Sequence, residues 1–526
     1  MIIHKIGRLV ITVSYLKFSQ VYMRVYYNIR QKIRKITNFQ YPMFLQTSNT
    51  NLQFSSILVN SKSYKSKKEF TFLNISKSFP EEIDWNYNNN AKLWTYNLTY
   101  FDYLHQEEMT KEKGIELIND FIDQSDQIKD GLEPFPISLR GMNWIKFLSR
   151  HQIADQQISH SLYAQYMILM DNLEYHLLGN HLLENGFSLL FGAYYFQDEK
   201  LYAKAKKIVR EELEEQILDD GAHFELSPMY HQIMLYRVLD CINLLQNNDW
   251  KNQELLTLLT DKAEVMLGWL NTITYENGNI PLLNDSTNKI APTTEQLNEY
   301  ANSLNIKTKI LALTESGYRK IENSKYEMIV DVGNIGPDYI PGHAHSDTFN
   351  FELYIERKPF IVDTGLSTYE MNERRMLERS TVSHNTVEID GINQSEIWGA
   401  FRVASRAKVI ALAEKDNYIS ASHNGYKKRL GTMHQREYLF DEQSIKIIDT
   451  IHSEKKYNAI ARLHFYPGVH VEKKDDCIVC NGIKIFSSSK ELEILEYLYA
   501  PQFNKTVPAQ MVEIKFNHKL EVEIEI

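Results

Sequence analysis

Three histidines and one aspartate lie close together between residues 341 and 387. His343 and His345 are two positions apart, so in an extended strand both side chains would point to one face. Asp363 and His384 occur in two further stretches whose alternation of apolar residues is typical of strands. Imidazole and carboxylate groups that meet from separate strands can bind a divalent metal and leave one histidine for proton transfer. The alternative is that all four are ordinary, hydrogen-bonded residues of a sheet.

A second polar group opens a predicted helix. Residues 179–186 read G-N-H-L-L-E-N-G, in which Asn180 and Glu184 are four apart and share a helix face. An amide beside a carboxylate could receive the carboxylate of an acidic sugar. The alternative is that Asn180 caps the helix, which its position after Gly179 also fits.

A turn and a helix start are predicted around Pro228, which suits the first helical position. Tyr230 and His231 would then lie in the first turn. There the positive end of the helix dipole would favour a phenolate, which is useful for abstracting a proton from carbon. The alternative is a core tyrosine whose hydroxyl is hydrogen-bonded.

Arg140, Asn143 and Trp144 form a third group, near the start of another predicted helix. Arginine, asparagine and aromatic side chains of this kind bind sugar chains. Packing in the core is an equally good interpretation.

The elements that position these groups divide the chain into two parts. At 526 residues, with 43% hydrophobic and 24% charged residues, the chain predicts a folded protein of two or three domains. Residues 86–314 repeat the 3.6-residue apolar period of helices, and residues 315–526 show the two-residue period of short antiparallel strands. We expect an α+β multidomain chain, with a helical toroid followed by a β-sandwich and the site between them.

Residues 1–85 have no clear role. Lys5 and Arg8 precede a short apolar run, and a stretch rich in Tyr and Arg follows. The run is too short to span a bilayer and no signal-peptide cleavage site follows it. A packing helix is the preferred interpretation, and a basic helix lying on a membrane or a partner is the alternative. We expect a cytoplasmic bacterial protein, with a periplasmic or secreted one as the alternative. The net charge of −10 argues against nucleic-acid binding.

Five motifs in this order resemble the heparinase II/III family of polysaccharide lyases: G-N-H-L-L-E-N-G, G-A-H-F-E-L-S-P-M-Y-H, G-H-A-H-S-D, V-D-T-G and S-H-N-T-V. The resemblance covers about residues 90–470. It implies an incomplete (α/α) toroid followed by an antiparallel β-sandwich. It also implies cleavage of uronic-acid-containing polysaccharides by β-elimination, which leaves an unsaturated uronate. Similar proteins occur among bacterial exopolysaccharide and capsule genes.

The resemblance implies a role for each matching residue. Asn180 would neutralise the substrate carboxylate, Tyr230 would act as base or acid, and His343 would be the partner base. The resemblance also implies a structural divalent metal, zinc, held by His345, Asp363 and His384. The remaining substrate-binding candidates are His181, Glu184, Arg140, Asn143, Trp144, Glu225 and Arg379.

Two other functions fit the sequence. A glycoside hydrolase on the same scaffold would use two carboxylates that face the scissile bond, Glu184 with Glu225 or Asp285. A non-catalytic protein that binds or assembles an acidic exopolysaccharide would need no proton transfer. The polymer and the oligomeric state are not legible in the sequence.

Overall fold

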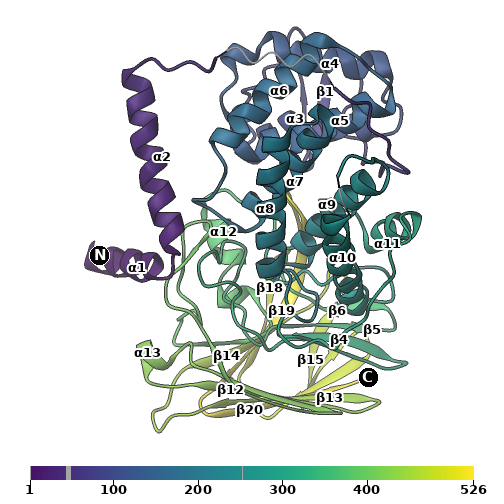
Figure 1. Cartoon of the computed structure of the whole chain (residues 1–526). Helices are drawn as coiled ribbons and strands as arrows, with labels where there is room; N and C mark the ends of the chain where they lie inside the picture. Colours follow the sequence, from purple (N-terminus) through teal and green to yellow (C-terminus); the bar gives the residue numbers. More distant parts are fainter. Residues whose placement is uncertain (1, 43–48, 252) are drawn as a thin grey trace.

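A helical body and a body of β-sheets are stacked on each other in the computed structural model, which describes residues 2–42, 49–251 and 253–526 (Figure 1). Two helices, α1 (Ile2–Ser14) and α2 (Phe18–Ile36), precede both bodies and lie at one edge of the molecule. A short hairpin of β1 (Glu69–Phe72) and β2 (Ile75–Ser78) packs its aromatic residues into the helical core.

The helical body consists of helices that follow one another along the chain with short connections. They are α3 (Lys92–Tyr100), α4 (Lys111–Asp123), α5 (Pro134–Arg150), α6 (Gln156–Asp171), α7 (Gly179–Phe196), α8 (Glu199–Gln216), α9 (Pro228–Gln246), α10 (Glu254–Ile273) and α11 (Thr294–Ser303). Helix α5 is buried on nearly every side from Pro136 to Ser149, so it is a central helix of this body.

The second body contains antiparallel sheets, and its first strand follows α11 after a connection without helix or strand. One four-stranded sheet has the order β3-β4-β5-β6, another β18-β19-β14-β7, and an eight-stranded sheet the order β10-β11-β12-β13-β20-β17-β16-β15. The strands are β3 (Tyr318–Glu322), β4 (Tyr326–Asp331), β5 (Phe351–Ile355), β6 (Lys358–Ile361), β7 (Val387–Ile389), β8 (Ile397–Trp398), β9 (Arg402–Val403), β10 (Val409–Lys415), β11 (Tyr418–His423), β12 (His434–Phe440), β13 (Ser444–Ile451), β14 (Ala459–His464), β15 (Val471–Lys474), β16 (Cys477–Cys480), β17 (Ile483–Ser487), β18 (Leu492–Gln502), β19 (Lys505–Phe516) and β20 (Lys519–Glu525). Two short helices, α12 (Glu373–Glu378) and α13 (Lys427–Leu430), lie between strands.

Sequence period explains why these segments are strands. In β13 buried and half-buried residues alternate along the whole strand, because successive side chains of a strand point to opposite faces. The buried faces of the sheets share one large core, and the helical body has another. The predicted α+β architecture, helices first and antiparallel sheets second, is therefore confirmed.

Two loops meet where the bodies touch. Residues 274–293 connect α10 to α11 in the helical body, and residues 332–350 connect β4 to β5 in the sheet body. The backbone N–H of Asp285 in the first loop donates to the carbonyl of His343 in the second, over 3.0 Å. We call this contact region the seam.

Candidate active site at the seam

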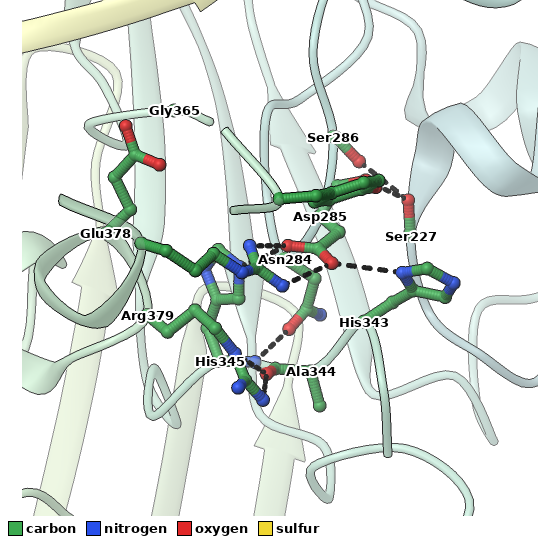
Figure 2. A network of polar contacts seen from close by, with 12 residues as sticks. Ser227, Asn284, Asp285, Ser286, His343, Ala344, His345, Gly365, Glu378 and Arg379 are labelled. Atoms are coloured by element: carbon green, nitrogen blue, oxygen red, sulfur yellow. Dashed lines mark hydrogen bonds and ion pairs between the residues drawn. The ribbon is translucent and has the colours of Figure 1, made fainter. Parts of the chain in front are cut away.

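Tyr230 lies in the first turn of α9, as the sequence predicts. Pro228 occupies the start of the helix, and the hydroxyl of Ser227 accepts a hydrogen bond from the Tyr230 N–H over 3.3 Å. The same hydroxyl donates to the carbonyl of Asp285 over 2.8 Å (Figure 2). The helix cap therefore holds Tyr230 and the 274–293 loop in one fixed arrangement.

The Tyr230 ring stacks on the imidazole of His343, with the ring centroids 3.8 Å apart and an angle of 28° between the planes. Both side chains are partly exposed, so a ligand can reach them. The phenol oxygen lies 3.2 Å from the hydroxyl of Tyr369. A phenol from the helical half and an imidazole from the sheet half thus face the same point.

Burial raises the pKa of the Tyr230 phenol above its usual range. The expectation of a favoured phenolate is therefore wrong for this site, because loss of hydration disfavours the charged form. A neutral phenol is a proton donor.

Asp285 links the two histidines of the 332–350 loop. One carboxylate oxygen lies 3.0 Å from His343 Nδ1 and the other 2.8 Å from His345 Nε2 (Figure 2). Arg375 donates to both oxygens, over 2.5 and 2.7 Å. Burial opposes ionisation, but Arg375 and the histidines outweigh it and hold the pKa of the Asp285 carboxyl well below its usual range.

An ionised Asp285 fixes the orientation of His343. A carboxylate only accepts, so it favours the tautomer in which His343 Nδ1 carries the proton. His343 Nε2 is then the basic nitrogen, and it lies 3.5 Å from both Asn180 Nδ2 and a Glu225 oxygen. The two histidines lie in a loop, so the expected strand face is wrong, yet their side chains converge on one carboxylate.

Asn180 and Glu225 form the polar floor beside His343. The backbone N–H and the side-chain amide of Asn180 donate to Glu225 over 3.1 and 3.2 Å. Leu178 is the cap position of α7, so the interpretation of Asn180 as the helix cap is wrong. Burial raises the pKa of the Glu225 carboxyl, although His343 opposes the shift. This shift favours the neutral form of Glu225 next to the place where a sugar carboxylate would arrive.

His181 follows Asn180 on α7 and is partly exposed. Its Nδ1 lies 3.1 Å from Glu174, and its ring packs against Phe135. Burial opposes protonation, but Glu174 prevails and raises the pKa of the His181 imidazole. A cationic His181 can attract an acidic sugar.

Four predicted substrate-binding residues are structural instead. Glu184 is fully buried and pairs with Arg237 over 3.2 Å, inside the helical body. Arg140, Asn143 and Trp144 are buried in α5. Arg140 donates to the carbonyls of Thr99 and Gly131 and to the side chain of Gln165, Asn143 donates to Tyr100 and Asp102, and Trp144 packs against Phe101 and Phe121.

Arg379 is a fifth correction, because it is buried and holds a loop. It donates to the carbonyl of Ala344, between the two histidines (Figure 2). It also donates to the carbonyls of Gly399 and Ala400. Burial, with the repulsion of Arg375, lowers the pKa of Arg379 to about 9. The arginine supports the backbone that carries His343.

The three predicted metal ligands are buried at the base of the site, but they are not gathered into one ligand set. His384 Nδ1 pairs with Asp363 over 2.7 Å, and His345 pairs with Asp285 instead. Across the described ranges, no group of three or more His, Cys, Asp or Glu side chains is placed to hold an ion. His345 Nδ1 and His384 Nε2 are buried without a hydrogen-bond partner among the described residues, and the two ring centroids lie 5.3 Å apart, so zinc stays a prediction.

Three residues of the site were not assigned these roles from the sequence. Asp285 was weighed only as a hydrolase carboxylate, Arg375 is one of several arginines before S-H-N-T-V, and Tyr369 lies in an irregular loop. Asp285 and Tyr369 lie in loops, and Arg375 lies in the short helix α12, so no long amphipathic pattern marks them.

Comparisons with known proteins identify the family of this chain. The family profile described as "Heparinase II/III N-terminus" matches residues 140–310, and that described as "Heparinase II/III-like, C-terminal" matches residues 305–525. The chain belongs to the heparinase II/III family. Together these matches span the helical body from α5 onward and almost all of the sheet body.

The chain is similar to a heparin-sulfate lyase from Bacteroides stercoris. The two are 26% identical over 251 residues, which are 42% of this chain and 37% of that protein. The alignment thus spans well under half of that relative's length. A crystal structure of heparinase III matches with a TM-score of 0.68 and 16% identity, over 85% of this chain and 80% of the other. Heparan sulfate lyase HepC from Pedobacter heparinus matches with a TM-score of 0.55 and 16% identity, over 87% and 81%. These likenesses confirm the predicted toroid and β-sandwich.

Proposed function

We propose that this heparinase II/III family member is a polysaccharide lyase that cleaves uronic-acid-containing acidic polysaccharides of the glycosaminoglycan class by β-elimination. The observation that carries the proposal is the Tyr230–His343 stack, at 3.8 Å, beside Asn180 and Glu225. The similarity to a heparin-sulfate lyase supports the substrate class.

Elimination needs three functions at one sugar ring. The proton on C5 is only weakly acidic while the neighbouring carboxylate keeps its charge, so that charge must be neutralised. A base then takes the proton, and the electron pair forms the C4–C5 double bond as the C4–O bond breaks. An acid protonates the departing oxygen.

Asn180, Glu225 and His181 supply the first function. A protonated Glu225 can share its proton with the incoming carboxylate, and the Asn180 amide keeps Glu225 in place. A cationic His181 adds a positive charge nearby. This neutralisation stabilises the negative charge that develops on the carboxyl group as the C5 proton leaves.

His343 and Tyr230 supply the other two functions. Asp285 holds the Nδ1 proton of His343, so Nε2 takes the C5 proton. Tyr230, kept neutral by burial, donates its phenolic proton to the leaving oxygen. Both groups lie on the same side of the sugar in this arrangement, because their rings are stacked.

The hydrolase alternative is disfavoured by the state of its carboxylates. Glu184 is buried against Arg237, and both oxygens of Asp285 are engaged by Arg375 and by histidines. Glu225 then has no free carboxylate partner among the three candidates, whereas hydrolysis needs two.

Absorbance spectroscopy tests the proposal. Incubation with heparan sulfate, hyaluronan, alginate or gellan should raise the ultraviolet absorbance for at least one polymer, because elimination creates a conjugated double bond. New reducing ends without that absorbance would indicate hydrolysis. Binding of a polymer with neither product would indicate the non-catalytic alternative.

Tyr230→Phe should lower kcat by about 10²–10⁴-fold, the usual contribution of a positioned proton donor. Tyr236→Phe is the matched control, because Tyr236 lies on the same helix and its hydroxyl contacts the buried Lys146 at 3.2 Å. Equal activity of the two variants would contradict the assignment of Tyr230.

A further inference from the structure

Helices α1 and α2 expose an apolar surface that nothing in the described part of the chain covers. They carry twelve large hydrophobic side chains that face solvent, more than half of all such side chains in the described residues. At the two ends of α2, Phe18 is 83% exposed and Ile36 is 82% exposed. We call this set the apolar ridge; its members are Ile6, Leu9, Val10, Val13, Phe18, Val21, Tyr22, Val25, Tyr26, Ile29, Ile33 and Ile36.

The opposite face of α2 is polar and lies against the helical body. Gln20 donates to the carbonyl of Leu177 over 2.9 Å, and Arg30 and Arg34 both pair with Asp171, at 3.0 and 2.6 Å. These positions recur on one helical face. An ordinary surface helix buries its apolar stripe and exposes its polar face, so α2 is turned the other way.

Helix α1 repeats this orientation. Arg8 pairs with Glu396 over 2.8 Å, and Thr12 accepts a hydrogen bond from Trp398 over 3.0 Å. Its exposed apolar side chains, Ile6, Leu9, Val10 and Val13, lie on the other side of the helix from these contacts. Two consecutive helices that both turn hydrophobic residues outward indicate a surface shaped for an apolar partner.

Charge identifies the partner. Residues 1–36, which include α1 and α2, contain eight Lys and Arg and no Asp or Glu, although the whole chain has a net charge of −10. Lys32 and Lys35 are exposed beside the apolar ridge. Cationic residues next to an exposed stripe of aliphatic and aromatic side chains are the features of helices that lie in the interface of a bilayer containing anionic lipids.

We propose that α1 and α2 dock this protein on the surface of an anionic lipid bilayer, with the apolar ridge inserted at the level of the headgroups. None of the described helices is both long and apolar enough to span a bilayer, which fits attachment from one side. A second copy is a poorer occupant, because two such cationic segments would repel each other.

The docked helices would hold the catalytic seam near the membrane. The Arg406 guanidinium lies 3.7 Å from the ring centroid of Tyr15, in the elbow between the helices, and Lys17 lies 4.0 Å from that of Tyr339. Tyr339 belongs to the 332–350 loop that carries His343. The enzyme would then act on polysaccharide close to a lipid surface.

Vesicle flotation of the full chain tests the docking. We expect binding to vesicles of phosphatidylcholine mixed with phosphatidylglycerol, much weaker binding to phosphatidylcholine alone, and weakening by salt. The double variant Val25→Asp/Ile29→Asp should bind at least about tenfold more weakly, and Lys32→Glu/Lys35→Glu should show a similar loss.

Ile310→Asp is the matched control, since Ile310 is 70% exposed in the connection between the two bodies. It should bind vesicles as the wild type does. Circular dichroism checks that every variant is folded, and turnover of soluble polysaccharide checks the site separately. Failure of the wild type to float, or an equal loss in Ile310→Asp, would overturn the proposal. A concentration-dependent dimer that only Val25→Asp/Ile29→Asp abolishes, with no vesicle binding, would assign the apolar ridge to a second copy.

Discussion

Replacement of Asp285 by Asn tests whether the buried carboxylate orients His343. The two oxygens of Asp285 make four contacts, two with Arg375 and one each with His343 and His345. An asparagine keeps one oxygen and presents an NH₂ group to donors on the other side, so two of the four contacts are lost. At about 1.5–3 kcal/mol for each hydrogen bond to a charged group, the fold should lose about 3–6 kcal/mol.

The same change should also lower the rate of catalysis. Without the acceptor at Nδ1, His343 can adopt the tautomer that places its proton on Nε2, where the base is needed. The serine-protease triad offers a comparison, in which the equivalent change lowers kcat about 10⁴-fold. We expect Asp285→Asn to lower kcat by about 10³–10⁴-fold with a smaller change in KM.

Asp449 provides a matched control in the sheet body. It is equally buried, and it accepts from Arg436 over 2.7 and 2.8 Å and from His434 over 2.7 Å. Asp449→Asn should therefore cost similar stability in thermal unfolding but leave kcat within about twofold of the wild type at a temperature where it is folded. If Asp285→Asn also kept its kcat while losing stability, the positioning role of Asp285 would be refuted.

Three further measurements probe other parts of the molecule. Tyr369→Phe should change kcat by less than about tenfold, because its hydroxyl contacts Tyr230 rather than substrate; a loss as large as that of Tyr230→Phe would contradict the arrangement. Burial raises the pKa of Glu212 from 4.5 to about 7, so the folded chain binds the extra proton and stability should fall by up to about 3 kcal/mol as pH rises through that range. Glu212→Gln should flatten this dependence in thermal unfolding between about pH 5 and pH 8, and an unchanged slope would disprove it. If zinc is bound, elemental analysis should find about one equivalent in the wild type and less in His345→Ala; equal contents would exclude the predicted ligand.

Sequence periodicity predicted the order of the two bodies well, because each period reports directly on the face that an element buries. The helical apolar period of the sequence continues from residue 163 to residue 178, but α6 ends at Asp171, and Leu173 to Leu178 form a loop that contacts α2. The apolar residues of that loop happen to follow the spacing of the apolar face of a helix. Helix α2, which is distant in sequence, contacts this loop. The spacing of residues in the sequence does not predict that contact.

In the site, too, some residues could be predicted from the local sequence and others could not. Tyr230 was predictable, since a serine followed by proline marks a helix start locally. Arg140 and Asn143 are predicted to bind substrate because arginine and asparagine beside aromatic residues near a helix start are suited to a sugar chain. Helix α5 is instead central, and those groups satisfy buried carbonyls and side chains. Asp285 could be placed only by the fold, since it meets His343 across 58 positions of sequence.

The Arg375–Asp285 ion pair joins the two halves of the molecule, because Asp285 comes from the helical half and Arg375 from the sheet half. The catalytic residues therefore reach their positions only when the helical half and the sheet half dock on each other. A denaturant concentration that separates the two halves should abolish turnover while the hydrophobic core of each half is still folded. Refolding chains should regain secondary structure first and activity last.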